Sequence, residues 1–173
     1  MKTTLPLLAC LCALALAAVE PIPAFAPNER VLFQGDSITD GNRGRSADPN
    51  HILGHGYAFI IAARHGAGFP ERKLDFYNRG VSGNTVRELY KRWTKDTIEL
   101  KPDLLSVMIG VNDHSKNVPL AEYEKTYDEL LAAARAANPN LKAPKGFFAE
   151  AEEVDQGFDW AEEEEEAVDV EAL

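Results

Sequence analysis

The sequence predicts an α/β fold built on a parallel sheet, and this prediction rests on two kinds of segment that alternate along the chain. Short apolar, β-prone runs that are typical of buried strands lie at 30–34, 74–77 and 104–109. Amphipathic or helix-favouring segments lie at 57–65, 85–100 and 120–137. Strands that alternate with helices are joined by right-handed crossovers, which make neighbouring strands parallel.

Each predicted strand ends at a polar turn that contains glycine. The first strand runs into Gly35, the second is followed by the turn 80–83, and the third is closed by Gly110. Because open parallel sheets form their sites at the carboxyl ends of the strands, we expect the functional site where these three turns meet.

The predicted helices have recognisable ends and faces. We expect the first to end near the stop signals Gly66 and Gly68, with His65 near its C-terminus where a positive charge favours the helix dipole. The segment 85–100 places Leu89 and Trp93 on one apolar face, and Trp93 and Tyr127 are expected in the core. Asn138-Pro139 ends the last helix, and 40–56 is predicted to be a loop.

The N-terminal segment 1–26 is predicted to be a signal peptide and spacer. Lys2 precedes an uncharged run, 5–19, that ends in small residues suited to cleavage after Ala17 or Ala18. A membrane-spanning helix needs about 20 apolar residues, so no stable span is expected after the signal is removed, although an uncleaved anchor stays open. We therefore expect an exported, periplasmic or extracellular protein.

Charge divides the rest of the chain into a domain, 27–148, and an acidic tail, 149–173. The net charge is −10, and the tail holds acidic residues but no Lys or Arg, so the preceding part is close to neutral. Such a tail is predicted to be disordered, and the lack of a basic face argues against nucleic-acid binding. Cys10 and Cys12 are the only cysteines, which excludes a disulfide scaffold or Cys-based zinc site in the domain.

The three turns carry residues suited to acyl chemistry. Ser37 directly follows the first strand, near a helix N-terminus that favours negative charge, as a nucleophile requires. Gly83 lets a backbone N–H approach a substrate oxygen, and the Asn112 amide can donate to the same oxygen. A backbone N–H together with an Asn amide makes a workable oxyanion hole. Asp36 and Asp113 are interpreted as turn caps, and Ser82 as a residue that closes its turn.

Taken in order, these segments resemble the conserved blocks of the SGNH (GDSL-type) hydrolase superfamily. Gly-Asp-Ser-Ile at 35–38 is similar to the first block, Gly83 to the glycine of the second, and Gly-Val-Asn-Asp at 110–113 to the third. The resemblance covers roughly 29–139. It implies that Ser37 is the nucleophile and that the N–H groups of Ser37 and Gly83, with the Asn112 amide, form the oxyanion hole.

The resemblance also implies a fold and a class of substrate. The superfamily has a three-layer, flavodoxin-like α/β/α fold with a parallel sheet. It hydrolyses esters and thioesters of lipids, acyl groups and acetylated sugars, so a small-molecule ester is the expected partner. It uses neither a metal nor another cofactor.

The sequence departs from the superfamily in its last block, Asp-x-x-His, which supplies the general base. No histidine lies beyond His114, and the strands that would accompany the block are missing too, so the sheet is expected to keep an unpaired edge. His51 has Asp-x-x-His spacing but precedes the second block, His55 lies in a glycine loop, and His114 adjoins the third block. These three are weak candidates, and no base is assigned.

Three interpretations of the incomplete pattern stay open. The chain is an exported serine ester hydrolase, or a catalytically inactive pseudoenzyme that binds acyl or sugar ligands, or the product of a truncated or frame-altered gene. The abrupt change of composition after Pro144 motivates the third.

Overall fold

The computed structural model describes residues 25–46 and 51–143. Most of the predicted signal peptide and spacer, all of the acidic segment 149–173 and the Asp48 that precedes His51 lie outside these residues. Within the described part of the chain, no helix is long and apolar enough to cross a membrane.

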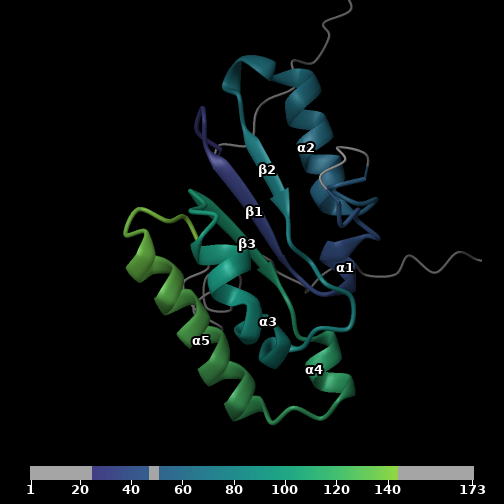
Figure 1. Ribbon diagram of the computed structural model, residues 1–173, viewed down its shortest axis with the longest axis vertical. Coiled ribbons are helices and arrows are strands. Elements are labelled where there is room, and N and C mark those ends of the chain that lie inside the picture. Colours follow the sequence, from purple (N-terminus) through teal and green to yellow (C-terminus); the bar gives the residue numbers. More distant parts are fainter. Residues whose placement is uncertain (1–24, 47–50, 144–173) are drawn as a thin grey trace, which may run out of the picture.

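Three parallel strands form the sheet, as the sequence predicts. They are β1 (Arg30–Gly35), β2 (Asp75–Asn78) and β3 (Leu104–Met108), in the order β2-β1-β3 (Figure 1). In the register of the sheet, Val31 of β1 lies opposite Phe76 of β2 and Leu104 of β3. The central position of β1 places the end of this strand between the ends of the other two.

Helices cover both faces of the sheet, which makes the three-layer α/β/α architecture. The helix α2 (Tyr57–Gly68) lies on one face, and α3 (Val86–Trp93) and α5 (Leu120–Ala137) lie on the other (Figure 1). Four shorter helical turns complete the described elements: α1 (Ser37–Asp40), η1 (Pro70–Arg72), η2 (Thr94–Ile98) and α4 (Val111–Ser115).

Alternating residues of β1 supply both hydrophobic cores. Val31 and Phe33 pack with Ala58 in the α2 layer, while Leu32 packs with Leu89 in the layer of α3 and α5. Val31, Leu32 and Phe33 are almost completely buried, because a strand at the centre of a parallel sheet has a helix layer on each face.

The helix α2 ends at Gly68, the second of the two predicted stop signals, and continues through Gly66 because its buried face extends to His65 and a lone glycine is tolerated in a helix. The structure corrects two other predicted boundaries. The segment 85–100 is not one regular helix, since α3 gives way to a π-helical turn, η2. The polar turn after β3 continues directly into α4.

The outer edge of β3 carries little further pairing within the described residues. One isolated parallel bridge joins Leu104 to Lys142, and the Lys142 N–H donates to the Asp103 carbonyl at 2.9 Å. Within residues 25–46 and 51–143, this bridge is the only strand pairing on that edge, and the predicted unpaired edge stays a prediction. The possible short strand that begins at Lys145 lies outside the described residues.

Candidate active site

The first site segment is the junction of β1 and α1, where Ser37 is the first helical residue. Asp36 caps the helix as predicted, since its Oδ1 accepts the Ile38 N–H at 3.0 Å. Ser37 is exposed, and its hydroxyl makes no hydrogen bond to any described residue. The chain thus presents a free hydroxyl at the carboxyl end of the central strand, beside helical N–H groups.

Gly35 must be glycine because β3 passes very close to it. A Cβ at this position would lie 2.1 Å from the Met108 carbonyl oxygen and 2.3 Å from Thr39 Oγ1. The next residue, Asp36, donates its N–H to that same carbonyl at 3.3 Å. This contact holds the first segment against the end of β3.

The second segment, the turn after β2, is fastened to the first by Asp40. The Asp40 Oδ2 atom accepts the N–H of Ser82 at 2.9 Å and its hydroxyl at 2.8 Å, and the Val81 N–H donates to the Gly35 carbonyl at 3.0 Å. Ser82 therefore bridges two segments, which is more than the turn closure that the sequence suggests. Gly83 follows it with φ +80°, a left-handed conformation that favours glycine.

Asp40 is a buried carboxylate with many donors. Arg45 binds it in bidentate fashion, at 3.0 Å to Oδ1 and 2.7 Å to Oδ2. Burial alone would raise the pKa of Asp40, but the hydrogen bonds from Arg45, Ser82 and Arg43 outweigh burial and hold that pKa well below its ordinary value. Sequence reasoning missed Asp40 as a site residue, because nothing in the local pattern indicates a partner 42 positions away.

The third segment is α4, which follows β3 and carries Asn112. The Asn112 Nδ2 donates to the Asn84 carbonyl at 3.0 Å, and Lys116 Nζ donates to the Gly83 carbonyl at 2.7 Å. Asp113 is buried and its Oδ1 accepts the Val86 N–H at 2.9 Å, so it caps the neighbouring helix α3. Burial raises the pKa of Asp113.

The three segments are joined to one another pairwise at one end of the sheet. Gly35 and Asp40 of the first segment bind the second segment, and Asn112 of the third segment also binds the second. Asp36 of the first segment binds the end of β3, directly before the third segment. The sequence predicted that the three turns would meet at the carboxyl ends of the strands, and the structure brings them together there. Ser37, Gly83 and Asn112 therefore belong to adjoining segments.

Arg92 supports two of these segments from α3. Its Nη2 donates to the Gly35 carbonyl at 3.1 Å and its Nε donates to Asn84 Oδ1 at 2.8 Å. Burial lowers the pKa of Arg92, although Asp96 opposes the shift through a hydrogen bond and its charge. Sequence reasoning missed Arg92, because it reads as an ordinary charged residue on an amphipathic helix.

The structure does not bring any of the candidate histidines to Ser37. His51 and His55 are exposed, with ring centroids 5.0 Å apart, and line one hollow beside α2. His114 is exposed on α4 and lines another hollow with Gly110. Among the described residues, no histidine hydrogen-bonds to Ser37, and no group of three or more His, Cys, Asp or Glu side chains could hold a metal ion.

Comparison with known proteins gives a consistent family assignment. The family model of the GDSL-like lipase/acylhydrolases matches residues 33–169. An acetylxylan esterase of Geobacillus stearothermophilus is 37% identical over 139 residues, which are 73% of this chain and 64% of that protein. The chain therefore spans less than two thirds of the length of this curated relative.

Solved structures agree with the sequence matches. A GDSL-like lipase from Parabacteroides merdae is 34% identical, with a TM-score of 0.64 over 69% of this chain and 59% of that one. The Geobacillus acetylxylan esterase Axe2 is 38% identical, with a TM-score of 0.60 over 68% of this chain and 58% of that one. Catalytic variants of Axe2 replace a serine, an aspartate, or a histidine three residues after that aspartate. The chain belongs to the GDSL-like lipase/acylhydrolase family, whose members are hydrolases that act on ester bonds.

Proposed function

We propose that this protein is an exported serine ester hydrolase that acts on acyl or acetyl esters of carbohydrates or lipids. Ser37 is the nucleophile, and the Gly83 N–H and the Asn112 amide bind the oxyanion. The observation that carries the proposal is the set of hydrogen bonds that joins the three segments at the carboxyl end of β1. A free hydroxyl lies in one of these segments, and unused N–H donors lie in the other two.

The donors that the reaction needs are available. Within the described residues, the Gly83 N–H makes no hydrogen bond, and the Asn112 Nδ2 uses one N–H on the Asn84 carbonyl and keeps the other. The Ser37 Oγ attacks the acyl carbon and the carbonyl oxygen gains negative charge, which these donors stabilise. Loss of the alcohol leaves an acyl-serine, and water then releases the acid.

The proposal leaves the group that takes the proton of Ser37 unassigned. A serine hydroxyl is a weak nucleophile unless an adjacent base activates it. Because no described histidine hydrogen-bonds to Ser37, a pseudoenzyme that binds the same acyl or sugar ligands without turnover is the second candidate function.

The substrate class follows from the named relative. The acetylxylan esterase is similar along most of the described fold, so we place acetylated carbohydrates ahead of lipid esters as substrates. Export rests on the predicted signal peptide, and N-terminal sequencing of protein recovered outside the cytoplasm would test it through cleavage after Ala17 or Ala18.

Hydrolysis of p-nitrophenyl acetate by the full chain tests the proposed nucleophile. The Ser37→Ala variant is expected to lose the protein-dependent rate, while Ser115→Ala keeps it, because the Ser115 hydroxyl bonds only the Val111 carbonyl of its own helix. The Asn112→Ala variant is expected to lower kcat about 10²- to 10³-fold through loss of one oxyanion donor. Equal rates for the unmodified chain and Ser37→Ala would refute the assignment.

A fluorophosphonate probe separates the enzyme from the pseudoenzyme. The proposed hydrolase forms a covalent adduct at Ser37 that mass spectrometry locates, and Ser37→Ala forms none. The pseudoenzyme instead binds acetylated xylooligosaccharides equally well with and without the hydroxyl and forms no adduct.

A further inference from the structure

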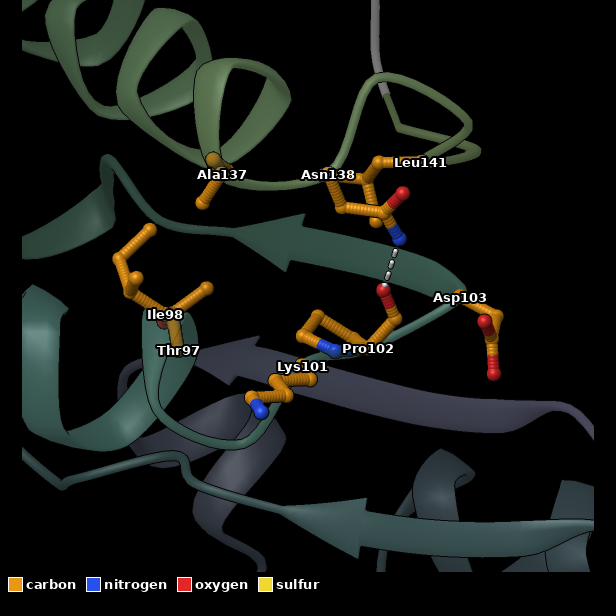
Figure 2. A pocket seen from close by; sticks show the side chains of 9 residues that line it. Thr97, Ile98, Lys101, Pro102, Asp103, Ala137, Asn138 and Leu141 are labelled. Atoms are coloured by element: carbon orange, nitrogen blue, oxygen red, sulfur yellow. Dashed lines mark hydrogen bonds between the residues drawn. The ribbon is translucent and has the colours of Figure 1, made fainter.

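A hollow on the β2 edge of the sheet gathers three arginines. It has a volume of about 280 Å³ and lies between the chain that follows α1 and the strand β2 with its following turn. Arg43 and Arg45 line it from the chain that follows α1, and Arg79 lines it from the turn that follows β2. We call it the arginine hollow. It is separate from the cavity of about 350 Å³ near Pro102 and Asn138, which lies beside the start of β3 (Figure 2).

The guanidinium group of Arg79 donates no hydrogen bond to any described residue, and its Nε is buried. The guanidinium carbon of Arg79 lies over the Tyr77 ring, 5.9 Å from the ring centroid. A buried N–H of a cation that lacks an acceptor costs free energy, so this group is suited to an acceptor that comes from outside the chain.

The other two arginines place further positive charge close by. Burial, and then the charges of Arg45 and Arg79, lower the pKa of Arg43 to about 10, so Arg43 stays protonated at neutral pH. All three arginines line the same hollow. The Arg43 Nε donates to the Gly80 carbonyl at 2.9 Å, which fixes its direction without neutralising its charge.

The carboxylates around the hollow already have arginine partners. Asp40 is paired with Arg45 at 2.7 Å, and Asp75, which lines the hollow, is paired with Arg30 at 3.0 Å. Asp96, on η2, is paired with Arg92 at 3.3 Å. Arg43 and Arg79 therefore form no ion pair within the described residues, and the hollow keeps an excess of positive charge in a chain whose net charge is −10.

We propose that the arginine hollow binds an oxyanion, a carboxylate or phosphate group, through the guanidinium groups of Arg79 and Arg43. Guanidinium N–H donors match the paired oxygens of both kinds of group, and the charge-assisted hydrogen bonds supply the acceptor that Arg79 lacks. The oxyanion is either a free inorganic ion or the acid group of a sugar.

The acid-sugar source deepens the proposed function and rests on it. Arg43 contacts the Gly80 carbonyl and Arg45 contacts Asp40, so the hollow adjoins the same turn that carries Gly83. An acetylated sugar that bears a carboxylate could then be held at the hollow while its ester reaches Ser37. Binding of the anion itself requires no catalysis, and it can be tested even if the chain hydrolyses nothing.

The experiment titrates the full chain with sodium phosphate at constant ionic strength, with chloride as the replaced ion. Thermal unfolding and the NMR signals of the arginine Nε–H groups are followed together. We expect a saturable rise in Tm and a shift of the Arg79 signal. The Arg79→Gln variant should bind at least about tenfold more weakly, because one charged hydrogen bond is lost. The matched control Arg64→Gln, at an exposed position on α2, should bind like the unmodified chain.

Two results of the phosphate titration would overturn anion binding at the arginine hollow. An unchanged affinity in Arg79→Gln, or a response to phosphate no larger than that to chloride, would overturn it. If circular dichroism shows that Arg79→Gln does not fold, the NMR signals of the unmodified chain decide, because the Arg79 signal must move and the Arg64 signal must not.

A second titration identifies the source of the anion. Glucuronate is compared with glucose, which lacks the carboxylate, and with phosphate. Tighter binding of glucuronate than of phosphate supports a carboxylated sugar, and the reverse order supports a free inorganic anion. Failure of both anions to bind would contradict the arginine hollow as a site while leaving the test of Ser37 unaffected.

Discussion

At the scale of single residues, burial affects the two most informative polar side chains in opposite ways. Asp40 is surrounded by donors and stays ionised. His65 lies among aromatic rings, and neither of its ring nitrogens has a hydrogen-bond partner among residues 25–46 and 51–143. Burial, followed by the charges of Arg64 and Arg72, lowers the pKa of His65. His65 lies in the last turn of α2, as predicted, but burial disfavours the protonated form that would favour the helix dipole.

His65 should make stability fall in mild acid. In the unfolded chain, His65 binds a proton below about pH 6.5, its ordinary pKa. In the folded chain, His65 binds this proton only at a lower pH, because its pKa is lowered. The free energy of unfolding therefore falls as the pH drops through that window. Urea denaturation across pH should show this fall in the unmodified chain and much less of it in His65→Leu.

The exposed His55 provides the control for this measurement. The His55→Gln variant is expected to keep the pH dependence of the unmodified chain, because no burial opposes its protonation. An acid-induced loss of stability of the same size in His65→Leu and the unmodified chain would rule out His65 as its origin.

At the scale of elements, α3 begins with a complete capping box directly after the candidate oxyanion turn. The Thr85 Oγ1 accepts the Arg87 N–H at 3.3 Å, and Glu88 Oε2 accepts the Thr85 N–H at 2.9 Å. Hydrogen bonds from the hydroxyl and the N–H of Thr85 lower the pKa of Glu88 to about 2. The start of α3 is therefore fixed within two residues of Gly83.

Removal of this cap should destabilise the domain measurably. The Thr85→Ala variant loses the acceptor for the Arg87 N–H and the hydroxyl that donates to Glu88, although the N–H of residue 85 still donates to Glu88. The expected cost is about 1–2 kcal/mol in the free energy of unfolding at pH 7. The control Thr94→Ala, at an exposed position one residue after α3, should change it by less than about 0.5 kcal/mol. Equal losses in urea denaturation would contradict the role of the cap.

At the scale of the whole molecule, one strand holds the two cores together. The side chains of β1 alternate between the layer of α2 and the layer of α3 and α5. If β1 leaves the sheet, both cores therefore lose buried side chains at once. The chain spans 57–64% of the length of the Axe2 structures and of the curated acetylxylan esterase, and the edge of β3 carries only the Leu104 bridge within the described residues. We therefore expect both layers to unfold as one unit.

The Phe33→Ala variant tests this cooperativity. Phe33 is 2% exposed in the α2 layer, and its truncation should cost about 3–5 kcal/mol. With Trp160→Phe present, tryptophan fluorescence reports only Trp93, which lies in the opposite layer. On denaturation, the Phe33→Ala substitution should shift the fluorescence transition and the far-UV circular dichroism transition by the same amount. Phe59→Ala, at a 49% exposed position, should have little effect. Separate transitions would show that the layers unfold independently.

The sequence by itself determined the alternation of strands and helices, the bounds of the helix 120–137, and the three turns that carry Ser37, Gly83 and Asn112. These features depend on local periodicity, turn residues and chain order, all of which are visible within a few neighbouring residues. Only the tertiary structure decided that Asp40 binds Ser82, that Arg92 binds Gly35, and that Arg79 finds no acceptor in the described part of the chain. The contact of Asp40 with Ser82 joins residues 42 positions apart, and the contact of Arg92 with Gly35 joins residues 57 positions apart. No local sequence pattern specifies which buried donor bonds to which distant acceptor.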